Sequence, residues 1–232
     1  MKFEDLVKLY EKYKQEYRNE AYKHISELFD EAKKVHKKDW LKSPTPGKDH
    51  GQSWKPFKGH NLEKLILYII QSEVEKLGLR VIRGDKFERT KPENLTAELS
   101  KVKRKVAVDF GEFGLHAPDV DLVIYDPKDC EVIAILSSKV TLRERIAQTG
   151  YWKIKLNQDK ATKHIKVFFI TLDEDKTLNV RKPAKKGRAI VEVDTDGSYV
   201  MSEEEIEESN KVKKFDKFLR DLKSIIDAKR KK

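Results

Sequence analysis

Two short apolar runs in the middle of the chain constrain its fold most. Residues 121–125 and 131–137 each begin with an acidic residue, the second run ends with a serine, and all their other residues are apolar. The polar residues 126–129 lie between the two runs. Runs of this length suit strands that are buried on both faces of a sheet. Because the polar connection is tight, the two strands are expected to pair as an antiparallel hairpin.

Five stretches have the apolar spacing of helices. Each repeats apolar side chains every three or four residues, and several carry start or stop signals, such as Gly78 after one helix and Thr141 with Glu144 at capping-box spacing at the start of another. A segment rich in proline and glycine, residues 39–60, is expected to be a loop. The predicted helices cover residues 3–38 with a break near Arg18 and Asn19, and residues 61–77, 94–103, 141–162 and 211–230.

The remaining apolar segments are too short for helices and are predicted to be strands. The expected strands cover residues 79–82, 105–110 and 165–172, and a second hairpin is expected from residues 189–193 and 199–200. Together these elements predict an α/β fold with a central mixed sheet, helices on its faces and helical additions at both ends. We expect a helical N-terminal segment over residues 1–45 and a core with a C-terminal helix over residues 46–232.

Composition limits the kinds of site and partner. Charged residues make up 39% of the chain, with one cysteine and two methionines, a balance typical of proteins from thermophiles. The formal net charge of +10 fits either a nucleic-acid partner or a lysine-rich solvated surface. Cys130 is the only cysteine, so no internal disulfide and no cysteine-based zinc site can form.

The histidines and the hydropathy of the chain give weaker indications. The six histidines show no metal-ligand spacing, and His24 is expected to be structural. No signal peptide is recognisable, and no apolar run approaches the 18 or so residues that cross a bilayer, so a soluble cytoplasmic protein without a membrane partner is expected.

An aspartate and a lysine lie at the ends of the two central strands. Asp121 leads into the first strand, and Lys139 ends the second, 18 positions later. In the predicted hairpin these two side chains can lie side by side, and Ser137 points in the same direction as Lys139. A carboxylate that binds Mg²⁺ and an ammonium group that positions water or stabilises charge on phosphorus are what phosphodiester hydrolysis requires.

The residues around this pair resemble those of a known family. The segment from Ser137 through Lys139, Leu142 and the following Arg-Glu-Arg run resembles the one that follows the catalytic lysine in several type II restriction endonucleases of the PD-(D/E)xK superfamily. Upstream, residues 53–63, with the Gly59–His60 pair, resemble the helix that opens their core. The resemblance spans residues 53–158 and implies a restriction-endonuclease-like fold and a Mg²⁺-dependent nuclease in which Asp121 and Lys139 are catalytic.

The chain departs from the superfamily pattern at one position. The residue two positions before the lysine is often Glu or Asp, but here it is Ser137. The resemblance still implies that Ser137 is one of the catalytic residues at the end of this strand. Glu63 is the first candidate for the missing metal-binding carboxylate. Glu144 is the second, with the alternative that it pairs with Thr141 in a capping box. Asp119 competes with Asp121 as the motif aspartate, and Asp121 is favoured because it enters the strand directly.

The same resemblance implies a substrate and an assembly. Arg143, Arg145, Gln148 and His60 are the candidates for contacts with DNA, because arginine binds phosphates and reads guanine. The implied protein is a type II restriction endonuclease that cuts double-stranded DNA at a short specific sequence as a homodimer. A repair nuclease or Holliday-junction resolvase of the same fold, and a non-catalytic nucleic-acid-binding protein, remain the alternatives.

Overall fold

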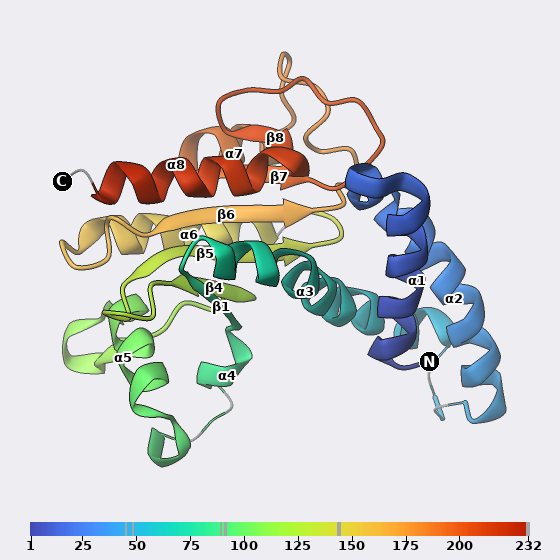
Figure 1. Ribbon diagram of the computed structural model, residues 1–232, viewed down its shortest axis with the longest axis horizontal. Coiled ribbons are helices and arrows are strands. Elements are labelled where there is room, and N and C mark those ends of the chain that lie inside the picture. Colours follow the sequence, from blue (N-terminus) through green and yellow to red (C-terminus); the bar gives the residue numbers. More distant parts are fainter. Residues whose placement is uncertain (45, 48, 89, 91, 143–144, 231–232) are drawn as a thin grey trace.

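A six-stranded mixed sheet forms the centre of the computed structural model, which describes residues 1–44, 46, 47, 49–88, 90, 92–142 and 145–230 (Figure 1). Its strand order is β1-β4-β5-β6-β7-β8, and a separate two-stranded sheet pairs β2 with β3. The strands are β1 (Arg80–Arg83), β2 (Val108–Asp109), β3 (Leu115–His116), β4 (Leu122–Tyr125), β5 (Val132–Lys139), β6 (Lys166–Thr171), β7 (Gly197–Val200) and β8 (Val212–Lys214).

The predicted central hairpin is confirmed. Strands β4 and β5 pair antiparallel, with Leu122 opposite Leu136 and Val123 opposite Ile135. Strand β1 is antiparallel to β4, whereas β5, β6, β7 and β8 run parallel to one another. The sheet is therefore mixed, and β4 and β5 are buried along nearly their whole length as their apolar sequences require.

One face of the sheet is covered by α3 and α8, with α1 and α2 packed beside α3 (Figure 1). The short helix η1 contacts α1 and α2. A single apolar cluster joins these helices to side chains such as Leu136 and Ile170 on the sheet. The helices of this layer are α1 (Phe3–Tyr17), η1 (Arg18–His24), α2 (Ile25–Lys42), α3 (His50–Lys76), η4 (Phe215–Lys217) and α8 (Phe218–Arg230).

The opposite face is covered by α5, α6 and α7. Val123 and Ile135 pack in a cluster with α5 and α6, and Phe169 packs in another with α6 and α7. The mixed sheet flanked by helices on both faces confirms the predicted fold class. These helices are α5 (Ala97–Val106), α6 (Arg145–Gln158) and α7 (Lys186–Asp194), and the shorter helical turns are α4 (Asp85–Glu88), η2 (Pro92–Asn94) and η3 (Gly111–Phe113).

The loop predicted for residues 39–60 is wrong at both ends. Helix α2 continues to Lys42, and α3 already begins at His50. The Asp49 carboxylate accepts a hydrogen bond from the Gln52 backbone amide at 2.8 Å, and the Gln52 side chain accepts one in return from the backbone of Asp49. This capping box and the burial of Trp54 hold the first turns of α3 despite Pro56 within the helix.

Three other predicted segments differ from the structure. Residues 189–193 belong to α7, not to a hairpin, because the same apolar spacing lets Val191 pack inward from a helix. Helix α5 extends to Val106, which is buried one turn after Val102. Of the predicted strand over residues 105–110, only residues 108 and 109 form a strand. Residues 212–214 form edge strand β8, and α8 starts only at Phe218.

The predicted break in the first helical segment is confirmed, because η1 separates α1 from α2. Division of the chain at residue 45 stays a prediction, although one apolar cluster contains side chains from both sides of it. Among the described helices, none combines the length and the hydropathy that crossing a membrane demands.

Candidate active site

Asp121 and Lys139 form an ion pair at the end of the central hairpin. Asp121 directly precedes β4, and Lys139 is the last residue of β5. The Lys139 ammonium donates a hydrogen bond of 2.7 Å to Asp121 Oδ2, and the side chains are only 16% and 23% exposed. The backbone amide of Ser138 donates to the same oxygen at 2.5 Å. Strand β5 therefore fixes the carboxylate through both its backbone and its last side chain.

A second carboxylate reaches this edge of the sheet from α3. Glu63 Oε1 accepts a hydrogen bond of 2.6 Å from Nε of Arg83, the last residue of β1, and Arg83 Nη2 lies 2.8 Å from Asp85 Oδ2. Burial raises the pKa of Glu63, Arg83 opposes that increase, and the negative charges of Asp121 and Asp85 add to it. Since the charge of Asp121 acts on Glu63, the two carboxylates lie within electrostatic reach of each other.

The structure distinguishes Asp121 from Asp119 by their contacts. Asp119 is exposed and accepts a hydrogen bond of 2.9 Å from Gln148 Nε2 on α6, whereas Asp121 contacts Lys139. The geometry thus favours Asp121 as the motif aspartate. The Gln148 contact places this predicted DNA-binding residue next to the segment that enters β4.

Ser137 lies on the same face of β5 as Lys139, where it packs against α6. Its side chain is buried, and its Oγ lies 3.0 Å from Oγ1 of Thr149 on α6. A buried hydrogen bond of this kind fixes the position of α6 on β5. The contact supports a structural role for Ser137, and its assignment as catalytic stays a prediction.

The structure describes only some of the other predicted site residues. His60 is exposed on α3, with Nδ1 3.4 Å from Arg83 Nη2, so it borders the Glu63 network. Arg143 and Glu144 lie outside the described residues, and so does the capping box predicted for Thr141. Arg145 is the first residue of α6, which ends at Gln158 rather than at residue 162 as predicted. The Arg145 side chain lies outside the described part of the chain.

Arg83 and Asp85 were missed by the sequence analysis. Arg83 lies opposite Leu122 in the β1–β4 pair, one residue from Asp121, and contacts both Glu63 and Asp85. No motif marks these two residues. Only the pairing of β1 with β4, which the sequence does not reveal, would have indicated Arg83.

The donor set at this edge fits a divalent cation. Ser138 and Lys139 both donate to Oδ2 of Asp121, and no donor among the described residues contacts Oδ1. Glu63 contributes a second carboxylate whose Arg83 contact engages only Oε1. Carboxylate oxygens are the ligands that Mg²⁺ prefers. Asp121 and Glu63 could therefore hold the ion while Lys139 remains beside it.

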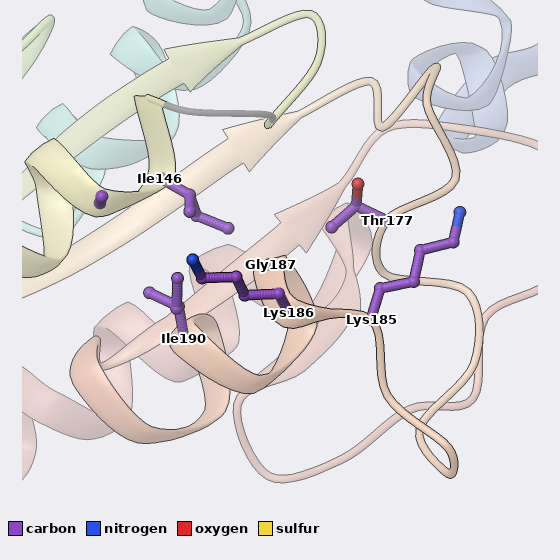
Figure 2. A pocket seen from close by; sticks show the side chains of 7 residues that line it. Ile146, Thr177, Lys185, Lys186, Gly187 and Ile190 are labelled. Atoms are coloured by element: carbon purple, nitrogen blue, oxygen red, sulfur yellow. The ribbon is translucent and has the colours of Figure 1, made fainter.

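One pocket beside α6 and α7 is lined by residues other than the ion pair. A pocket of about 460 Å³ opens between α6, α7 and the segment containing Thr177, but neither Asp121 nor Lys139 lines it. Figure 2 shows the Lys186 side chain extending toward Ile146 and Ile190 in this pocket. Lys185 points away from them, and its ammonium binds the carbonyl oxygens of Asp175 and Lys176.

Comparison with known proteins gives consistent matches. Residues 98–221 match the family model described as BsaWI restriction endonuclease type 2. A Methanocaldococcus jannaschii protein named as a type II restriction enzyme, MjaVIP, is 35% identical over 231 residues, which cover 97% of this chain and 95% of that protein. A Helicobacter pylori protein named as a type II restriction enzyme, HpyAORF263P, is 38% identical over 55% of this chain and 64% of its own length.

A solved structure shows that the fold is shared. The restriction endonuclease AgeI, solved as a complex with DNA, superposes with a TM-score of 0.54 and 14% sequence identity, over 89% of this chain and 82% of that chain. At this identity the likeness concerns the fold alone, and the mixed sheet with flanking helices is what the two share.

Proposed function

The chain belongs to the type II restriction endonucleases of the BsaWI family, and on that premise we propose that Asp121, Glu63 and Lys139 form its hydrolytic centre. The observation that carries the assignment is the 2.7 Å contact between Lys139 and Asp121 at the end of the central hairpin. It joins the two residues that the family's chemistry requires, a carboxylate that binds metal and an ammonium group beside the reacting phosphate.

Each residue of the centre has a distinct task in this proposal. Asp121 and Glu63 hold a divalent cation, which we propose is Mg²⁺ because only oxygen ligands are offered. When bound, the ion supplies Lewis-acid stabilisation of the phosphate and makes hydroxide available near neutral pH. Lys139 positions the attacking water and stabilises the charge that develops on phosphorus. The Ser138 amide keeps Asp121 oriented during the reaction.

Double-stranded DNA is the proposed substrate, cut at a short specific sequence. The net charge of +10 supports binding to a polyanion. His60 and Gln148 border the centre through Arg83 and Asp119, where they can contact the DNA backbone. Arg143 and Arg145 remain the candidates for phosphate binding or base recognition in the major groove.

A homodimer is the proposed assembly, because a two-fold symmetric DNA site is matched by two copies of one chain. The mass of the protein in solution with and without DNA, measured by light scattering, tests this directly. The cytoplasm is the proposed location because the DNA substrate is there. The lysine- and glutamate-rich composition supports a thermostable protein, and unfolding within the mesophile range of about 45–65 °C would contradict that proposal.

Digestion of a mapped plasmid with and without Mg²⁺ tests the whole assignment. We expect discrete fragments whose ends map to one sequence. Cleavage should fall by at least about 10³-fold in Asp121→Ala and Lys139→Ala, since Asp121 holds the cation and Lys139 acts at the reacting phosphate. Asp119→Ala is the matched control, because this exposed carboxylate contacts Gln148 and not Lys139.

The outcomes separate the proposed function from the alternatives. Loss of cleavage in Asp119→Ala but not in Asp121→Ala would refute the assignment of the motif aspartate. Family membership favours site-specific cleavage over a repair nuclease or resolvase, and cutting confined to branched substrates would reverse that preference. Metal-independent, salt-sensitive binding without any product would instead support a non-catalytic protein.

A further inference from the structure

One histidine and two glutamates meet where the N-terminal helices contact the segment after β7. His24 ends η1, Glu27 lies in the first turn of α2, and Glu203 follows β7. Nδ1 of His24 lies 3.4 Å from Oε2 of Glu27 and 3.3 Å from Oε1 of Glu203. One potential ligand atom from each residue lies within 4.8 Å of those of the other two, the only such group of three found among the described residues.

The imidazole of His24 is oriented into this group and is not satisfied there. The residue is 7% exposed, and its Nδ1 is buried without a hydrogen-bond partner. The ring of Tyr17 stacks on the imidazole with a centroid distance of 3.7 Å and an interplanar angle of 25°. A buried polar atom without a partner is rare and destabilises the folded state, so its persistence requires an explanation.

Two of the three spacings between the ligand atoms match a tetrahedral metal centre. Zinc binds histidine nitrogen and carboxylate oxygen at roughly 2.0–2.2 Å, which places neighbouring ligands of a tetrahedron about 3.3–3.6 Å apart. The two distances from His24 Nδ1, 3.4 and 3.3 Å, agree with that spacing. They are longer than expected for a charge-assisted hydrogen bond of about 2.7–2.9 Å.

We propose that His24, Glu27 and Glu203 form a binding site for a transition-metal ion of the Zn²⁺ class, separate from the hydrolytic centre. The imidazole nitrogen favours such ions over Mg²⁺, whose preferred ligands are oxygen atoms. Three protein ligands leave the fourth position for water. Because His24 and Glu27 belong to the N-terminal helices and Glu203 to the segment after β7, the ion links the N-terminal segment to the sheet-containing core.

The same three residues could instead form a proton-bridged cluster, with a charged His24 between two carboxylates. The Glu27 and Glu203 side chains are 51% and 54% exposed, so solvent screens such pairs and they contribute little. Metal binding and protonation can be told apart by adding Zn²⁺ and measuring the stability of the protein. A bound ion protects the protein as its concentration rises, whereas a proton bridge is indifferent to Zn²⁺.

Calorimetric titration of the full chain with Zn²⁺ tests the proposal. The Asp121→Asn variant serves as the background, and excess Mg²⁺ occupies the remaining oxygen-rich sites. We expect one Zn²⁺ per chain and an increase in the unfolding temperature on binding. Glu203→Gln and Glu27→Gln should each weaken the affinity at least about tenfold, because each removes one of three protein ligands.

Glu205→Gln is the matched control, because this exposed glutamate lies in the same segment but outside the group. Equal Zn²⁺ affinity in Glu203→Gln and Glu205→Gln, or no binding in the Asp121→Asn background, would overturn the proposal. His24→Ala alters a buried side chain and could impair folding. The exposed glutamates therefore carry the test, and cobalt spectra of the folded variants report whether an imidazole and carboxylates bind the ion.

Discussion

Replacing Gly84 with alanine should displace the catalytic aspartate without altering any catalytic side chain. Gly84 follows β1, and its amide donates a hydrogen bond of 2.9 Å to the carbonyl oxygen of Asp121. A Cβ atom at this position would lie 1.8 Å from the backbone oxygen of Val120 and 3.0 Å from its carbonyl carbon. Backbone atoms cannot rotate away, so the segment that leads into β4 must move.

The size of this movement follows from ordinary contact distances. Opening a 1.8 Å contact to normal van der Waals separation requires a shift of well over 1 Å, and the shift falls on Val120 and the adjoining Asp121. A misplacement of about 1 Å in a catalytic constellation can cost about 10²-fold in rate. Overpacking adds roughly 1–3 kcal/mol of destabilisation, and loss of the Gly84 hydrogen bond about 1 kcal/mol more.

The assay combines single-turnover cleavage with denaturant unfolding. We expect Gly84→Ala to cleave about 100-fold more slowly at a temperature where it remains folded. Gly59→Ala is the control, since nothing lies within 4 Å of its added Cβ and alanine stabilises a helix interior by up to about 1 kcal/mol. Wild-type cleavage and unchanged stability in Gly84→Ala would refute the close approach of β1 to residue 120 and the reasoning built on it.

Three further predictions concern charge and hydrogen bonding. Arg83→Gln should raise the pKa of Glu63 further, because Arg83 opposes the effect of burial. The cleavage rate should then begin to fall at a higher pH on the acid side of its pH profile, and an unmoved profile would exclude Glu63 from the centre. Ser137→Ala should lower the free energy of unfolding, measured in urea, by about 1–2 kcal/mol, because it leaves Thr149 without its hydrogen-bond partner. The same variant should reduce the cleavage rate less than tenfold, and a larger loss would indicate a catalytic hydroxyl. Burial raises the pKa of Asp173 from 3.8 to about 6, so the folded state favours the protonated form of this carboxyl. Protonated Asp173 therefore adds up to about 3 kcal/mol to the free energy of unfolding below about pH 4, and this stabilisation is lost as the pH rises through 6. Unfolding free energies of wild type and Asp173→Asn between about pH 4 and 7 should therefore differ by an amount that varies with pH, and a constant difference would contradict the shift.

Local patterns in the sequence predicted the centre of the molecule well. The β4–β5 hairpin requires only two apolar runs and a turn, and its pairing brings Asp121 to Lys139 without help from other segments. The mixed sheet and the helices on its faces follow from similar short-range periodicity. These features were predictable because the residues that determine them are close along the chain.

The failures also have local explanations. Glycines and prolines between residues 46 and 59 concealed the start of α3, although Asp49 and Gln52 have capping-box spacing that identifies it. In residues 189–193 a short apolar pattern fitted a strand and a helix equally, and packing of Val191 against the core decided for the helix.

Contacts between distant segments could not be predicted from one sequence. Arg83 meets Glu63 only because β1 pairs with β4 beside α3. Glu27 lies three residues after His24, but the meeting of His24 with Glu203 depends on the packing of η1 near the segment after β7. The contacts of Arg83 with Glu63 and of His24 with Glu203 are tertiary, so they leave no periodic signal in the sequence.

The two ends of the chain depend on each other, and this has a consequence for protein synthesis. The Tyr22 hydroxyl donates to Asp216, 194 residues later, and Leu6 shares one apolar cluster with Ile226. Helix α3, which carries Glu63, contacts α8 at the C-terminal end (Figure 1). Domains fold as units once their partner segments have emerged. We therefore expect the nascent chain to complete its active geometry only after α8 has left the ribosome.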